Sequence, residues 1–128
     1  AETEVSFDAD LLAMIINNPL IVRVNDPRDA VASADFIYTD TWIDMQYFND
    51  PAKHAEKTAL VAQMQRFQIN SDLVADHELK IMHDMPIHND YEITEAAVRD
   101  PRSIIFDQAA NRLHAQKGLL YWLLVANA

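Results

Sequence analysis

The chain has 128 residues, half of them hydrophobic, which is enough for one globular domain with a buried core and excludes a disordered polypeptide. Its formal net charge of −10 makes nucleic acid and anionic membranes poor partners, because like charges repel, and its longest apolar run, Leu119 to Ala126, is too short to span a bilayer. The lack of cysteine excludes disulfides, thiolate metal sites and a thiol nucleophile, and it is consistent with a reducing compartment, which we take to be the cytoplasm.

The start of the chain predicts a helix, a strand and a second helix. Apolar residues recur at helical spacing over 7–16, and the Asn-Asn-Pro sequence that follows should end this helix. The run LIVRV at 20–24 is short, apolar and β-branched, which is typical of a strand. Asp26 and Pro27 are residue types preferred at the cap and the first turn of a helix, so we expect the second helix to begin there.

The middle of the chain continues the alternation of strands and helices. Residues 35–40 (DFIYTD) read as a strand, and 41–52 as an irregular loop. Residues 52–68 carry apolar side chains near one face and lysines opposite, which predicts an amphipathic helix. A short helix is expected to begin at Asn70 or Ser71.

The last third predicts two more strands, each followed by a helix. The first strand covers 79–83, and its helix covers 94–100 with Asp90 or Thr94 as the cap. The second strand covers 103–106.

The closing helix is expected to run from about Gln108 to Ala126. Strands that alternate with helices indicate a parallel sheet with helices on both faces, so the predicted fold is a three-layer αβα, Rossmann-like domain.

Polar side chains follow three of the predicted strands at their carboxyl ends, where open parallel sheets bind ligands. They are Asp40, the pair His83 and Asp84, and the pair Asp107 and Gln108. From the residues alone a polar crevice and ordinary polar loops both remain open, and Asp40 could simply be a cap. The sequence has no G-x-G-x-x-G, P-loop or H-E-x-x-H pattern, so we expect neither a nucleotide fingerprint nor a metal site.

Three motifs in order give a more specific reading: YTDTW at 38–42, HDMP at 83–86 and AANR at 109–112. Together they resemble the carbamoyltransferase family, the ornithine carbamoyltransferases above all, which have a TD-x-W strand end, an H-C-L-P loop and an A-x-N-R helix start. The resemblance runs from about residue 22 to 124. It implies that 1–128 is a partial, ornithine-binding-like C-terminal domain, without the N-terminal carbamoyl-phosphate domain and without the first strand.

The resemblance implies a reaction and its partners. Carbamoyl phosphate would donate its carbamoyl group to L-ornithine, giving citrulline and phosphate, in a homotrimer that needs no metal or organic cofactor. The S-x-R-T loop with which the family grips phosphate is not found in this sequence, so we expect the 128-residue fragment alone to be inactive. The alternatives are a carbamoyltransferase for another amine such as putrescine, and a non-catalytic domain of the same fold.

The family pattern also implies roles for individual residues. Asp40 would pair with the α-ammonium of the substrate. In the loop with His83 and Met85, the backbone carbonyls after the histidine would hold the carbamoyl amide. Arg112 would contact carbamoyl phosphate and take part in catalysis, helped by a position near the N-terminus of its helix. The alternative for Arg112 is a surface arginine that pairs with Asp107.

Two departures from the family pattern concern the acceptor. Asp44, Met45 and Gln46 stand where the ornithine family has Ser-Met-Gly, and of these we expect Asp44 and Met45 to contact substrate. Asp44 would then lie near the α-carboxylate of ornithine, where like charges repel unless a cation intervenes. Asp84 replaces the cysteine, and we expect it to hold the terminal ammonium or accept its proton, a solvated loop aspartate being the alternative. Both departures favour a diamine over ornithine.

Overall fold

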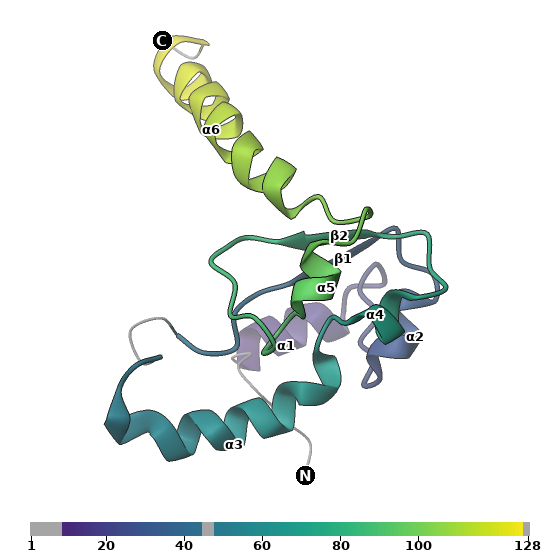
Figure 1. Ribbon diagram of the computed structural model, residues 1–128. Helices are drawn as coiled ribbons and strands as arrows, with labels where there is room; N and C mark the ends of the chain where they lie inside the picture. Colours follow the sequence, from purple (N-terminus) through teal and green to yellow (C-terminus); the bar gives the residue numbers. More distant parts are fainter. Residues whose placement is uncertain (1–8, 45–47, 127–128) are drawn as a thin grey trace.

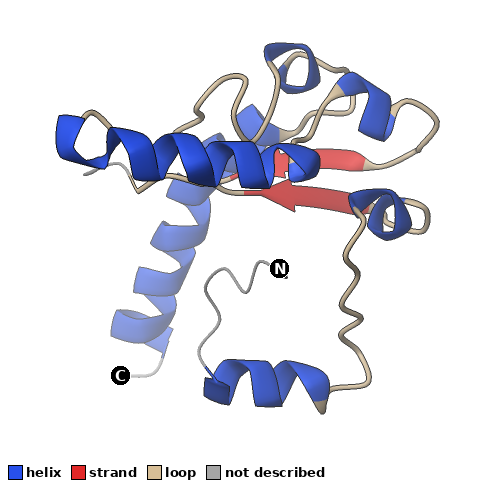
Figure 2. Ribbon diagram, turned by 90° about the horizontal axis from the view of Figure 1, so that it is seen from below, coloured by secondary structure: helices blue, strands red, loops and turns tan. Residues whose placement is uncertain are grey.

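The computed structural model describes residues 9–44 and 48–126, and the arrangement of its elements is seen in Figures 1 and 2. The elements in chain order are α1 (Ala9–Ile16), α2 (Pro27–Val31), β1 (Phe36–Thr39), η1 (Pro51–Lys53), α3 (His54–Met64), η2 (Gln65–Phe67), α4 (Ser71–Val74), β2 (Lys80–His83), α5 (Glu95–Val98), α6 (Ile105–Tyr121) and η3 (Trp122–Ala126). The η elements are 3-10 turns, except for η3, which is π-helical.

The sheet of the described residues is a parallel pair, β1 beside β2, in a register that runs from Phe36 opposite Lys80 to Thr39 opposite His83. Both strands therefore end at the same edge, as the alternation of strands and helices predicted. Both ribbon views place α3 on one side of the strands and α6 on the other (Figures 1 and 2). The small parallel sheet with helices on two sides is consistent with part of an αβα domain, in which α6 begins beside the sheet and then extends away from it (Figure 1).

The core is made of aliphatic side chains that the strands and short helices turn inward. Its fully buried members are Val31, Ile69, Val74, Leu79, Ile81, Ile93, Ala97 and Ile105. At about 25 cal/mol for each Å² removed from water, this burial is the main favourable contribution to folding of the domain. The core lies directly behind the carboxyl end of β2 and therefore holds that end in place.

The predicted helix caps are confirmed. The Asp26 carboxylate accepts a hydrogen bond from the backbone N–H of Arg28 (2.9 Å), with Pro27 at the first position of α2. Asn70 caps α4, which decides between the two starts expected for it, and Thr94 caps α5. Such caps satisfy backbone donors that have no partner within the helix, so they can be predicted from local sequence.

Two predicted strands are wrong. Leu20 lies in a turn and 21–24 are irregular and exposed, with Leu20 at 90% and Val22 at 81%, because no strand of the described residues lies beside them to accept their hydrogen bonds. The strand expected at 103–106 is reduced to a single bridge between Ser103 and Ile81, because helix α6 already begins at Ile105, three residues earlier than predicted.

An arginine clamp fixes the segment that leads into α6. The Arg102 guanidinium donates two hydrogen bonds to the Asp100 carboxylate (both 2.8 Å), and Nη1 donates to the carbonyl of Val74 and to that of His77 (2.6 Å). Hydrogen bonding from Arg102, reinforced by its charge, lowers the pKa of Asp100 from 3.8 to about 2. The clamp joins the end of α4 to the segment that pairs with β2.

Helix α6 projects from the body of the domain (Figure 1), and Ile105 is its buried residue. The end of α6 and the following η3 expose large apolar side chains, with 53–71% of each accessible: Leu119, Leu120, Tyr121, Trp122, Leu123, Leu124 and Val125. No helix within 9–44 or 48–126 combines the length and the apolar character needed to cross a membrane.

Candidate functional site

The candidate site lies where β1 and β2 end. Asp40 follows β1 directly, and His83, the last residue of β2, is paired in register with Thr39. The first turn of α6 reaches the same edge, because Gln108 forms a hydrogen bond with the backbone of His83. The residues predicted at the three strand ends are therefore brought together, although the third of them stands on a helix.

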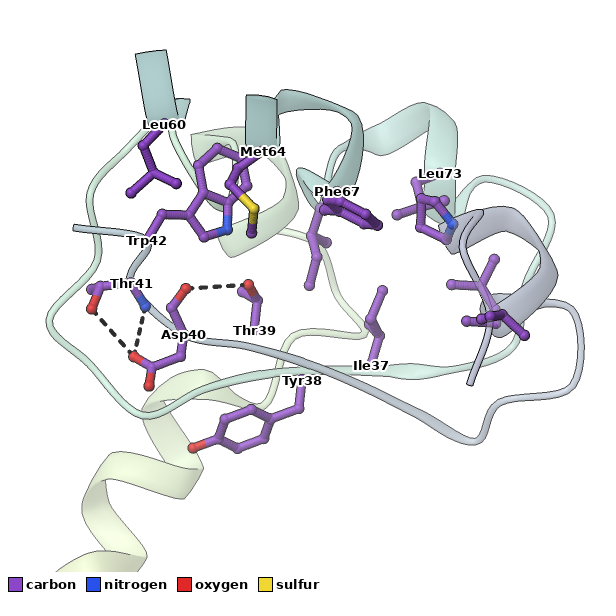
Figure 3. Close-up of a pocket in the computed structure, with 15 residues that line it drawn as sticks. Ile37, Tyr38, Thr39, Asp40, Thr41, Trp42, Leu60, Met64, Phe67 and Leu73 are labelled. Atoms are coloured by element: carbon purple, nitrogen blue, oxygen red, sulfur yellow. Dashed lines mark hydrogen bonds between the residues drawn. The ribbon is translucent and has the colours of Figure 1, made fainter. Parts of the chain in front are cut away.

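Asp40 is exposed, and a tight turn fixes one of its carboxylate oxygens. Oδ1 accepts hydrogen bonds from the backbone N–H of Thr41 (2.6 Å) and from its hydroxyl (3.3 Å), as Figure 3 shows. Within the described part of the chain, no hydrogen bond engages the other oxygen. Asp40 thus makes a local contact with the next residue and still presents a carboxylate oxygen to a cationic ligand.

Beside Asp40, a cavity of about 490 Å³ opens between β1, α2 and the end of α3. Its walls are mainly apolar, and Figure 3 shows Trp42 beside Leu60 and Met64. Trp42 thus lines the cavity together with the C-terminal part of α3.

His83 is fully buried, and its hydrogen bonds define its tautomer. Nδ1 accepts a hydrogen bond from the backbone N–H of Met85 (2.9 Å), so this nitrogen carries no proton. Nε2 therefore bears the proton and donates it to Oε1 of Glu92 (3.1 Å). With both nitrogens engaged, the imidazole holds the loop that follows β2 rather than reaching toward a substrate.

Glu92 is a component of the site that the sequence did not reveal. It is fully buried, and its Oε1 also accepts the backbone N–H of His88 (2.7 Å), while Oε2 has no hydrogen-bond partner among the described residues. Because the buried Glu92 carboxylate binds both the His83 side chain and the His88 backbone, it restricts the loop between these two residues. The sequence offers no sign of this contact beyond the position of Glu92 next to the buried Ile93.

The loop from His83 to Pro86 has an unusual backbone. Met85 has a φ of 62°, in the left-handed region, and is joined to Pro86 by a cis peptide bond. In this conformation the Met85 N–H donates to Nδ1 of His83 (2.9 Å), and the hydrogen bond helps to hold the loop. Such left-handed residues persist where the surrounding structure holds them, which is common at ligand sites.

Asp84 is exposed, with 45% of its side chain accessible. Its Oδ1 lies 3.4 Å from Nδ1 of His83, but Nδ1 is the acceptor of the Met85 hydrogen bond, so this contact is not an ion pair. The carboxylate is therefore available to a cationic group, as predicted, and equally to solvent.

Arg112 does not stand at the start of its helix, which corrects the prediction. It is the eighth residue of α6, roughly 10 Å along the axis from the first residue, and the dipole effect is confined to the first turn. Its side chain is exposed, and in the part of the chain that the structure describes it forms no ion pair, including with Asp107. Arg112 is nevertheless one turn beyond Gln108 on the same helix face.

Asp44 lines a second hollow, of about 310 Å³, together with Lys53 and Lys57 from η1 and α3. Glu56 lines the same hollow and pairs with Lys53 (2.8 Å), so the two lysines offset the negative charge around Asp44 only in part. Met45 and Gln46 lie outside the described residues. In 9–44 and 48–126 no group of three His, Asp or Glu side chains is arranged to hold a metal ion.

Comparisons with known proteins agree with this geometry. Residues 7–123 match the family described as aspartate/ornithine carbamoyltransferase, Asp/Orn binding domain. The ornithine carbamoyltransferase of Mycolicibacterium gilvum is 43% identical over 106 residues, which are 81% of this chain and 33% of that protein. The chain therefore spans about a third of the length of the curated relatives it matches.

Two solved structures extend the comparison. The ornithine carbamoyltransferase from Thermus thermophilus is similar with a TM-score of 0.69 at 34% identity, covering 91% of this chain and 35% of that one. A mutant N-acetyl-L-ornithine transcarbamylase, complexed with carbamyl phosphate and N-succinyl-L-norvaline, is similar with a TM-score of 0.56 at 30% identity, covering 72% and 27%. The αβα fold predicted from the sequence is thus the fold of carbamoyltransferases.

Proposed function

Because the chain belongs to the aspartate/ornithine carbamoyltransferase family, we propose that residues 1–128 are the acceptor-binding part of an enzyme that carbamoylates L-ornithine. Carbamoyl phosphate is the donor, and citrulline and phosphate are the products. The observation that carries this proposal is the meeting of Asp40, the loop after His83 and the first turn of α6 at one edge of the sheet. Since the matched residues cover only 33% of the Mycolicibacterium gilvum relative, the proposal concerns the intact protein.

Carboxylates bind the acceptor in this proposal. The unengaged oxygen of Asp40 pairs with the α-ammonium, and Asp84 holds the terminal ammonium and accepts its proton before the resulting amine attacks. Met45, outside the described residues, contacts the aliphatic chain of the acceptor. The exposure of Asp40 and Asp84 at the same end of the sheet supports this division of labour. The proton must leave before attack, because an ammonium has no lone pair.

Backbone and cationic groups bind the donor. The carbonyls after His83 hold the carbamoyl amide, and Met85 lies in this segment. Arg112 neutralises the phosphate that departs when the amine attacks the carbamoyl carbon. Catalysis then rests on positioning and on charge stabilisation, in which the protein supplies a fixed loop and a cation rather than a covalent step. No metal or organic cofactor takes part in this scheme.

A second acceptor class has a specific observation in its favour. Asp44 and Asp84 add two exposed carboxylates to the acceptor side, which suits a diamine such as putrescine better than an amino acid. Against this, Lys53 and Lys57 line the same hollow as Asp44 and partly offset its charge, although Lys53 also pairs with Glu56. The non-catalytic alternative predicts no turnover with any amine.

A substrate panel tests the proposal. The intact protein is incubated with carbamoyl phosphate and with ornithine, putrescine or an acylated ornithine, and phosphate release and the carbamoylated product are measured together. Citrulline formation with ornithine as the preferred acceptor supports the main proposal, and preference for putrescine supports the second. No product with any amine would refute both. Light scattering tests the homotrimer, and fractionation of cells tests the cytoplasmic location, which we also propose.

A further inference from the structure

Gln108 joins three elements at the site. From the first turn of α6 its side-chain Oε1 accepts the backbone N–H of His83 (3.2 Å), and its Nε2 donates to the hydroxyl of Tyr38 on β1 (3.3 Å). The oxygen and the nitrogen of one side-chain amide thus each form a hydrogen bond with a different strand. Gln108 itself is half-buried, and its backbone N–H donates to Ile104 (2.8 Å), so the side chain starts from a fixed turn.

The place of this contact in the hydrogen-bond ladder explains why it exists. On the outer edge of β2, Ile81 donates its N–H to the carbonyl of Arg102 (3.1 Å) and accepts from the N–H of Ile104 (2.9 Å). Two residues later, the N–H of His83 faces the same edge, because strand residues alternate. The neighbouring backbone has by then turned into α6, so the Gln108 amide supplies the missing acceptor.

The consequence concerns the donor side of the proposed site. Arg112 is four residues after Gln108 and lies on the same helix face, one turn farther along. The amide contact therefore sets the rotation of α6 about its axis, and with it the direction in which Arg112 projects relative to the loop after His83. A helix that otherwise extends away from the body (Figure 1) needs such an anchor.

We infer that Gln108 is a positioning residue for carbamoyl phosphate: it completes the β2 ladder at His83 and so aligns Arg112 with the carbonyls that hold the carbamoyl amide. Gln108 does not itself contact the substrate. This inference rests on the proposed function, and it assigns to the side chain a role in donor binding that differs from simple support of the helix start.

The inference is tested with Gln108→Leu in the intact protein. Loss of both hydrogen bonds should raise the KM for carbamoyl phosphate about tenfold or more, while the KM for the amine stays within about twofold. Gln108→Glu keeps an acceptor for His83 and can accept the Tyr38 hydroxyl proton, so it should restore most of the donor affinity. Tyr38→Phe should lie between the two. Gln63→Leu, the same change at an exposed position of α3, should behave as wild type.

A purely structural role would give a different result. It would reduce the fraction of active enzyme and lower the apparent kcat, while both KM values stayed unchanged, and that outcome would overturn the inference. So would a donor KM that is the same in Gln108→Leu and Gln63→Leu.

Amide hydrogen exchange separates this inference from the proposed function. The His83 amide should exchange about tenfold faster in Gln108→Leu than in wild type and should regain protection in Gln108→Glu. If the wild-type protein carbamoylates none of the three amines, the proposed function fails. Unchanged protection of His83 in Gln108→Leu refutes the anchoring contact whether or not the protein turns over.

Discussion

Glu92 is the residue whose removal should damage the site most. Its Oε1 is the acceptor for two buried donors, Nε2–H of His83 at 3.1 Å and the backbone N–H of His88 at 2.7 Å. A buried donor without a partner costs about 1–3 kcal/mol. Glu92→Ala should therefore cost about 2–6 kcal/mol, with a further penalty for the cavity. Domains are stable by only about 5–15 kcal/mol, so the loop should open readily.

The measurement is hydrogen exchange at the amides of His88 and Met85 in the intact protein, because exchange reports local opening without requiring two-state unfolding. A cost of about 2–6 kcal/mol corresponds to exchange roughly thirtyfold to ten-thousandfold faster. Glu92→Gln keeps Oε1, so its free energy of local opening should fall by at least about 2 kcal/mol less than that of the alanine variant. Glu56→Ala, an exposed change on α3, is the matched control. Equal protection of both amides in Glu92→Ala and Glu56→Ala would show that the reasoning about the buried acceptor is wrong.

Further predictions concern substrate binding and acid stability. Arg112→Ala should raise the KM for carbamoyl phosphate by roughly tenfold to a hundredfold, since a charge-assisted contact contributes about 1.5–3 kcal/mol; unchanged kinetics with wild-type folding would remove Arg112 from the site. Asp44→Ser should lower the KM for ornithine by a few-fold, because like charges near a surface repel by about 1 kcal/mol or more, and a ratio of ornithine to putrescine affinity that does not change would contradict this. Asp84→Ala should weaken both amines, and steady-state kinetics that match wild type would indicate that this carboxylate faces only solvent. The lowered pKa of Asp100 means that its carboxylate stabilises the folded protein above about pH 4 by about 2 kcal/mol, and that this contribution is lost as the pH falls from 4 toward 2. Asp100→Asn should remove that acid-sensitive part, seen as urea midpoints at pH 6 and pH 3 that lie closer together than in wild type, and an unchanged gap would count against the clamp with Arg102.

Local sequence signals predicted the features that depend on a few neighbouring residues. The start of α2 at Asp26 and Pro27 and the cap of α5 at Thr94 are confirmed, because a cap is made within three residues. The strand expected at 20–24 failed because a strand needs a partner, which local sequence cannot supply. The motifs YTDTW and HDMP were correctly placed at the ends of β1 and β2, and they meet because parallel strands end at the same edge of a sheet.

Other features depend on contacts between distant segments. The burial of Glu92 beneath His83, and the reach of Gln108 to the edge of β2, arise only when a loop and a helix return to the strand. The position of Arg112 was wrong for a related reason: α6 begins at Ile105, before the expected strand is complete, and the Gln108 side chain then takes the place of a backbone acceptor at His83. The spacing of apolar residues in the sequence does not reveal that a side chain takes the place of a backbone acceptor.

The single neighbour of β1 has a practical consequence for preparing this domain. Among the described residues, β2 flanks β1 on one side and no strand lies on the other, so the amide and carbonyl groups of that side are open to any extended chain. Phe36 and Tyr38 add exposed aromatic surface on the same strand. Open strand edges of this kind pair edge to edge with strands of other molecules, which leads to aggregation. A sample restricted to these 128 residues should therefore aggregate on storage. Apparent melting temperatures measured on it would then depend on the age and concentration of the sample as much as on its sequence.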